Sequence, residues 1–187
     1  MLAEGENMKN NKVKTIVFMS LYVALAIVLD YIKEFIPFLN MAAGGSINIA
    51  LIPVVVASFH LGYSKGVLTG LLWWLLSFVL GLNRYFISVP QYVLDYIIPS
   101  GIAGICSLFY KKKKITEAEI GITLMMIIRM ISVIISGAIY WPGDLAAGST
   151  AAWIYSLSYN LPYSLLTLIM LLLLVPIILK SLRKYLV

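Results

Sequence analysis

The sequence is poor in charged residues and contains a single cysteine and a single histidine. Only 12% of its 187 residues are charged and 61% are hydrophobic, with a mean hydropathy of +0.96. Soluble domains carry about 25% charged residues, so a lipid bilayer is the expected solvent. Because Cys106 is the only cysteine, no internal disulfide can form, and packing within an apolar helix is its expected role.

Further absences argue against several classes of function. No GxxxxGK[ST] loop is present, so ATP hydrolysis must be supplied by another protein. The chain lacks an HExxH pattern and has only His60 as a histidine, so we expect no enzyme, no metal site and no cofactor. The net charge of +6 arises from basic residues between apolar runs, without interleaved aromatics, so no nucleic-acid partner is expected.

Hydropathy predicts an all-α integral membrane protein with six transmembrane helices, in one transmembrane domain that covers residues 1–187. One span needs about 20 mostly apolar residues, so about six spans use most of the chain and leave short loops. Breaks at Gly, Pro, Asn and charged residues predict helices over 13–32, 47–62, 65–82, 90–110, 119–141 and 151–179.

The distribution of basic residues predicts the orientation, because Lys and Arg favour the cytoplasmic side of a membrane. With the N-terminus inside, Lys33 and Arg84 lie on the outer side and Arg129 lies within a span. The other eleven of the fourteen lie on cytoplasmic segments: Lys9, Lys12, Lys14, Lys65, Lys111, Lys112, Lys113, Lys114, Lys180, Arg183 and Lys184. Both termini are therefore predicted to be cytoplasmic.

Ionisable side chains within the spans are candidate functional residues, because they are costly in lipid. Asp95 follows Pro90 on a helix that enters from outside, which places it about 8 Å below the surface. Its partner is either a cationic ligand in an outward-facing cavity or Arg129. Asp30 and His60 lie near helix ends, where both can reach headgroups or water.

Aromatic and amide side chains lie at a similar depth. Counted from the outer ends of their helices, Trp141 lies at the surface, Tyr155 about 6 Å deep and Asn160 about 13 Å deep. With Asp95 and Tyr96 they suit a flat, cationic heteroaromatic ligand, since aromatic faces and a carboxylate attract a cation and an amide pairs with ring nitrogens. The remaining outer aromatics are expected to form an interfacial belt: Trp73, Trp74, Tyr85 and Tyr92.

Two strips of small residues predict close contacts of helices. Gly66 and Gly70, four residues apart, are expected to pack inside the protein. Ser20 and Ala24, spaced in the same way on the first helix, can receive a partner protein.

Five stretches, taken together, resemble the thiamine-specific S-component, the substrate-binding membrane subunit of energy-coupling factor (ECF) transporters. They are GGSI at 44–47, GVLTGLLW at 66–73, the pair Asp95 and Tyr96, SGAIYW at 136–141 and YSLSYN at 155–160. The resemblance covers nearly the whole chain.

The resemblance implies high-affinity binding of thiamine at the outer face of a prokaryotic cytoplasmic membrane and its delivery inward. It also implies partners, namely a transmembrane coupling protein and two ATPase subunits. Two sets of residues follow from it. The ligand contacts fall on Asp95, Tyr96, Trp141, Tyr155 and Asn160, and the contact with the coupling protein falls on Ser20 and Ala24.

Two departures from the family pattern leave the substrate open. Asp95 stands where the family usually has Glu, which is one methylene longer, and residues 129–133 (RMISV) lack the histidine of the family's Arg-x-x-x-His pattern. A thiamine precursor or a related vitamin is therefore an alternative ligand. A self-sufficient secondary carrier is another alternative, although the repeated halves with broken helices that are common in carriers are not found.

Overall fold

A computed structural model describes residues 2–40 and 45–184. Within these residues the fold is all-helical, with one isolated antiparallel bridge between Asn40 and Ser46. In chain order the elements are α1 (Leu2–Glu34), η1 (Pro37–Leu39), α2 (Leu51–Leu61), α3 (Tyr63–Val79), α4 (Val89–Tyr92), η2 (Val93–Ile97), α5 (Ile98–Ile102), η3 (Ala103–Phe109), α6 (Ile115–Tyr140) and α7 (Thr150–Ser181). The run from α4 to η3 is one continuous helical stretch, so apart from the three-residue η1 the described chain forms six helical segments, close to the six predicted places.

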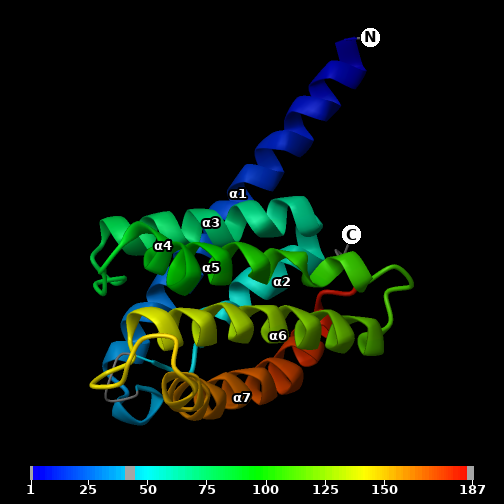
Figure 1. Cartoon of the computed structure of the whole chain (residues 1–187). Coiled ribbons are helices and arrows are strands. Elements are labelled where there is room, and N and C mark those ends of the chain that lie inside the picture. Colours follow the sequence, from blue (N-terminus) through cyan, green and yellow to red (C-terminus); the bar gives the residue numbers. More distant parts are fainter. Residues whose placement is uncertain (1, 41–44, 185–187) are drawn as a thin grey trace.

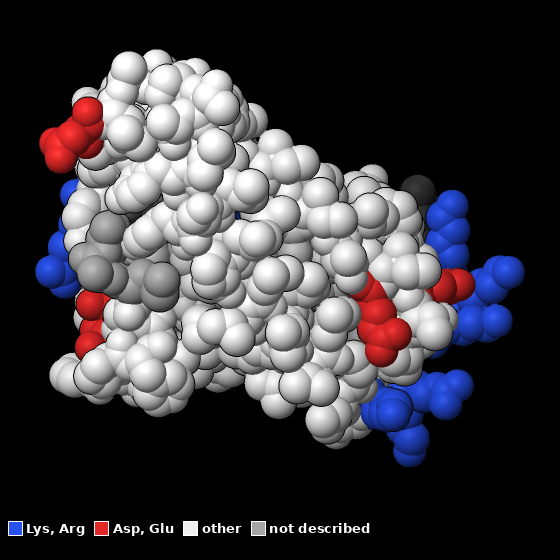
Figure 2. Space-filling view, turned by 60° about the horizontal axis from the view of Figure 1, so that its bottom comes forward, with Lys and Arg blue, Asp and Glu red and all other residues white. Residues whose placement is uncertain are grey.

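Four of these segments are long and apolar enough to cross a membrane. They are Asn11–Glu34 within α1, Val89–Phe109, α6 and α7. α2 is apolar but has only 11 residues, because it begins at Leu51 rather than at the predicted residue 47. Figure 2 shows that Lys and Arg gather mainly at one end of the molecule, while the broad surface between the ends carries few charged side chains.

The short helix α2 forms the centre of the core. Leu51, Val54, Val55 and Phe59 are completely buried, and α2 contacts α1, α3, η3 and α7. A helix that is apolar on every side is stable only when other helices surround it. α1, α3, η3 and α7 therefore pack around α2, and α6 packs beside α7 and against η3 (Figure 1).

Helix α1 is packed along only part of its length. Its buried positions recur every three or four residues, from Met19 through Val23, Ala26 and Ile27 to Asp30. This face lies against α2 and α3. The N-terminal half projects away from the bundle as a single helix (Figure 1).

Glycines allow α3 and the stretch from α4 to η3 to approach each other at backbone distance. A Cβ atom on Gly104 would lie 1.9 Å from the Val67 backbone nitrogen, and one on Gly70 would lie 2.1 Å from the Ser100 carbonyl oxygen. Gly66 packs in the same seam, with Ser58 and the Gly104 carbonyl oxygen within 3 Å of an added Cβ. The predicted internal packing of the Gly66 and Gly70 strip is therefore confirmed.

Replacing Gly104 with Ala is expected to lower the melting temperature of the purified protein strongly. The new methyl group would meet backbone atoms of α3 that cannot move alone, which costs about 3 kcal/mol. Gly101→Ala is the matched control, because the nearest atom there is the flexible Leu71 Cδ2 at 3.3 Å. Equal melting temperatures for the two variants would contradict this account of the seam.

Candidate functional site

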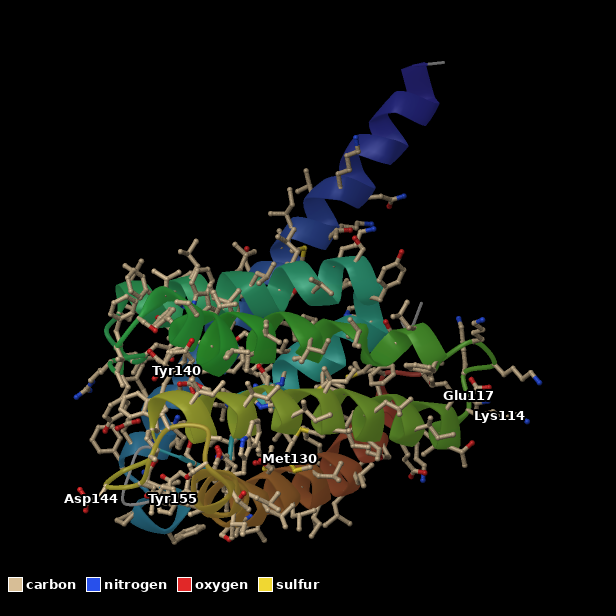
Figure 3. All side chains as sticks on the ribbon, in the orientation of Figure 1. Lys114, Glu117, Met130, Tyr140, Asp144 and Tyr155 are labelled. Carbon is tan, nitrogen blue, oxygen red and sulfur yellow. The ribbon has the colours of Figure 1, made fainter. Side chains whose placement is uncertain are left out.

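A cavity of about 650 Å³ is lined by residues of α1, α3, α6, α7 and the stretch from α4 to η3. All five predicted ligand contacts line it: Asp95, Tyr96, Trp141, Tyr155 and Asn160. Figure 3 shows Tyr140 and Tyr155 at the same end of the molecule, opposite Lys114 and Glu117. The sequence therefore identified residues that converge in space, although they come from three different helical segments.

Asp95 and Tyr96 lie on a π-helical turn, η2, within the stretch from α4 to η3. A π-helical turn widens the helix and shifts its hydrogen-bonding pattern, and such turns are common at functional sites. The Ser132 hydroxyl on α6 donates to the Leu94 carbonyl oxygen at 2.7 Å, which gives a carbonyl of this turn a partner. α6 thereby holds the turn with Asp95 and Tyr96 at the wall of the cavity.

The Asp95 carboxylate is held by two neutral donors. Its Oδ2 accepts hydrogen bonds from Gln91 Nε2 at 2.5 Å and from Trp141 Nε1 at 3.0 Å. Gln91 is itself completely buried and fixed, because its Oε1 accepts from the Ile87 backbone N–H at 2.9 Å. No Lys or Arg forms an ion pair with Asp95 within the described residues, so its charge is available to a cation in the cavity.

Arg129, the other partner considered for Asp95, bonds elsewhere. Its Nη1 donates to the Pro99 carbonyl oxygen at 2.9 Å, and its side chain lines the cavity. A guanidinium has five N–H donors. The remaining donors can serve an acceptor in the cavity, so Arg129 adds hydrogen-bonding capacity to the cavity wall.

Aromatic rings form much of the remaining wall. Tyr85 meets Trp141 edge to face, with ring centroids 6.1 Å apart, and the Tyr92 and Tyr96 rings lie 4.6 Å apart. Trp141 is 36% exposed, so part of its indole is accessible. Rings of this kind attract a cation through their faces.

Asn160 lies deeper in the cavity wall and is held in place on both sides. Its Nδ2 donates to the Ser156 carbonyl oxygen at 2.8 Å, and its Oδ1 accepts from the Tyr163 hydroxyl. These bonds fix the orientation of the amide. Tyr155, at 45% exposure, is the most accessible of the five predicted contacts.

Asp30 does not lie at an exposed helix end: it lines the cavity, and its carboxylate bonds within the protein. Asp30 is only 5% exposed, and its Oδ2 accepts from Trp73 Nε1 at 2.6 Å while Lys33 pairs with Oδ1 at 3.4 Å. α1 turns this carboxylate inward, against α3, rather than toward lipid. His60 likewise has a partner within the protein, since its Nδ1 lies 2.8 Å from the Tyr22 hydroxyl.

The predicted aromatic belt is wrong for most of its members. Trp73 and Tyr92 are buried, at 5% and 6% exposure, and Trp73, Trp74 and Tyr85 line the cavity. Their depth alone could not reveal this, because the direction of each side chain depends on how α3 and α4 pack. The bond from Trp73 to Asp30 turns the indole toward α1.

The small-residue strip on α1 lies outside the cavity. Ser20 and Ala24 are exposed on one face of α1, away from the lining residues. Gly44, part of the GGSI stretch, lies outside the described residues, whereas Gly45 and Ser46 line the cavity.

Comparisons with known proteins agree on one family. Residues 16–187 match the model of the family described as "Thiamine transporter protein (Thia_YuaJ)". The chain is 34% identical over 151 residues to "Thiamine transporter ThiT" of Bacillus subtilis (strain 168), which covers 75% of this chain and 77% of that protein.

A solved structure has the same fold. It is that of ThiT from Listeria monocytogenes, with a TM-score of 0.77 and 24% sequence identity, covering 94% of this chain and 98% of the other.

Replacing Asp30 with Ala is expected to destabilise the protein, because it leaves the buried Trp73 Nε1 without its acceptor and Lys33 without its partner. The loss is about 2 kcal/mol, read as a lower melting temperature in detergent. Asp144→Ala, in the exposed loop that follows α6, is the control and should melt like the unaltered protein. An unchanged melting temperature for Asp30→Ala would show that the Trp73 bond contributes nothing to stability.

Proposed function

This chain belongs to the thiamine transporter protein family, and from that premise we propose that it captures thiamine at the outer face of a membrane and delivers it inward. It is a multi-pass membrane protein and a transport protein rather than an enzyme. The observation that carries the proposal is the convergence of Asp95, Trp141 and the other three predicted contacts on one cavity.

The chemistry of the cavity suits thiamine, which joins an aminopyrimidine to a cationic thiazolium ring. The Asp95 carboxylate offsets the positive charge, and the exposed face of Trp141 stacks on a ring. Tyr96 and Tyr155 contribute further aromatic wall. The Asn160 Nδ2 donates to the carbonyl and hydroxyl oxygens of Ser156, so Asn160 recognises a polar donor of the ligand through the second lone pair of its Oδ1.

The structure shows the surroundings of the two departures from the family pattern, which are Asp95 in place of Glu and Val133 in place of His. The shorter Asp95 reaches Gln91 and Trp141 from a π-helical turn, so the ligand cation meets a carboxylate set back in the wall. Val133, at the position of the family histidine, lines the cavity without a polar group. We propose that Arg129 provides the missing hydrogen bond, since only one of its donors is bound to Pro99.

We propose six membrane spans, with both termini in the cytoplasm. α2 and α3 are the two segments shorter than 18 residues; α2 is buried in the core, α3 packs against it, and together they complete the set of six. The basic residues that gather at one end support this orientation (Figure 2), because Lys and Arg favour the cytoplasmic side. The cavity then opens toward the outside of a prokaryotic cell membrane.

We further propose that the whole chain, residues 1–187, acts as one transmembrane substrate-binding domain and as the S-component of an ECF transporter. A coupling protein and two ATPase subunits would supply the energy, since the chain has no phosphate-binding loop of its own. The exposed strip of Ser20 and Ala24 on α1 is the proposed contact with the coupling protein, because small residues allow another helix to approach closely.

Titration of the purified protein with thiamine, followed by tryptophan fluorescence and calorimetry, tests ligand binding. We expect saturable binding that weakens at least about tenfold in Asp95→Asn and in Trp141→Ala, because each loses about 1.4 kcal/mol or more of contact with the cation. The controls are Asp144→Asn and Trp153→Ala, which change similar side chains that do not line the cavity.

Two outcomes of this titration would redirect the assignment. Absence of thiamine binding, with saturable binding of a pyrimidine precursor or another vitamin, would keep the fold and the cavity but replace the substrate. Uptake of thiamine by liposomes that contain this chain alone would favour a self-sufficient carrier over a subunit.

Ser20→Trp and Ala24→Trp are expected to abolish co-purification with the coupling protein and ATP-dependent uptake, while thiamine binding stays unchanged. The bulky side chains would prevent close approach of a helix to α1, and both positions lie outside the cavity wall. Ile169→Trp, on the exposed face of α7, is the control and should retain both activities. Full uptake by the α1 variants would place the coupling contact elsewhere.

A further inference from the structure

Two side-chain hydroxyls on α7 hold the segment 45–48, which forms part of the cavity wall. The Gly45 backbone N–H donates to the Tyr159 hydroxyl oxygen at 2.9 Å, and the Asn48 backbone N–H donates to Thr167 Oγ1 at 3.1 Å. These residues are more than 110 positions apart in the chain. The segment is thus fastened to α7 at two points, about two helical turns apart.

The contact at Gly45 is close enough to require glycine. A Cβ atom there would lie 2.7 Å from Tyr163 Cε1 and 3.1 Å from the Tyr159 hydroxyl oxygen. The backbone of the segment therefore lies directly against the two rings, which meet edge to face with centroids 6.0 Å apart. Any shift of the Tyr159 ring is transmitted to Gly45.

The Thr167 and Tyr159 hydroxyls differ in whether their own proton already has an acceptor within the protein. Thr167 Oγ1 accepts from Asn48 and donates to the Tyr163 carbonyl oxygen at 2.8 Å, and Thr167 is buried outside the cavity wall. Tyr159 accepts from Gly45, but its own proton has no acceptor among the described residues. Since Tyr159 lines the cavity and is half-buried, that proton is available to a ligand.

We propose that the Tyr159 hydroxyl joins the ligand to the segment 45–48, by donating its proton to a ring nitrogen or hydroxyl oxygen of the ligand while it accepts the Gly45 N–H. This inference rests on the proposed binding of thiamine, which carries both kinds of acceptor. A hydroxyl that donates becomes a better acceptor, because consecutive hydrogen bonds polarise each other. Binding of the ligand therefore tightens the bond to Gly45, and Tyr159 acts as both a ligand contact and a positioning residue for the segment.

The rate of hydrogen exchange of the Gly45 backbone amide measures this coupling directly. In the full-length protein, labelled with [15N]glycine and kept in detergent, saturating thiamine should slow exchange of the Gly45 amide at least about threefold. In Tyr159→Phe the free protein should exchange faster at Gly45, and thiamine should no longer slow it. Dissociation of thiamine should be about three- to tenfold faster in this variant.

Thr167→Val provides the matched comparison, since it removes the second fastening without touching the ligand. When the Thr167→Val protein is labelled at Asn48, hydrogen exchange of the Asn48 amide should be faster than in the unaltered protein. Thiamine should still slow exchange of the Gly45 amide in this variant. A purely structural role of Tyr159 would make the two variants behave alike.

Two results would overturn the inference, and they are distinguishable. If unaltered protein binds thiamine in the fluorescence titration but Tyr159→Phe shows the same thiamine-dependent slowing at Gly45, the coupling through Tyr159 is wrong while the proposed function stands. If unaltered protein does not bind thiamine, the proposed function fails, and this inference fails with it.

Discussion

In a bilayer every backbone N–H and C=O group must find its hydrogen-bond partner within the protein, because lipid offers none. The chain meets this requirement with helices almost everywhere. Two departures from α-helix, the π-helical turn η2 and the segment 45–48, lie at the cavity wall. In each case hydroxyl side chains from neighbouring helices, Ser132 for the turn and Tyr159 and Thr167 for the segment, take part in bonding the irregular backbone.

The site depends on carboxylates that are oriented by neutral donors. Asp95 is bonded by Gln91 and Trp141, and Asp30 is bonded by Trp73 as well as Lys33. A neutral donor fixes the direction of a carboxylate but leaves its charge, whereas a basic partner would offset it. The difference explains why Asp95, rather than Asp30, suits the recognition of a cation.

The sequence predicted the places of the six longer helical segments and five residues of the cavity wall, because hydropathy and depth along a helix depend on local composition. It did not predict the direction of side chains around each helix axis. Asp30 and Trp73 were therefore misplaced at the membrane surface, although they bond to each other in the interior. The π-helical turn was not predicted either, although Pro99, which has no N–H for the Asp95 carbonyl oxygen, follows it closely. The roles of the five ligand contacts, and of Ser20 and Ala24, stay predictions.

Arg129 also bears on how the protein is made. A guanidinium at the centre of a span adds about 2.5 kcal/mol or more to the cost of inserting that span alone. Its acceptor, the Pro99 carbonyl oxygen, lies on the preceding segment and emerges from the ribosome earlier. Synthesis from the N-terminus therefore delivers the acceptor to the membrane before the arginine. α6 can enter the bilayer against a neighbour that already offers the hydrogen bond, and the biogenesis of this span depends on the one before it.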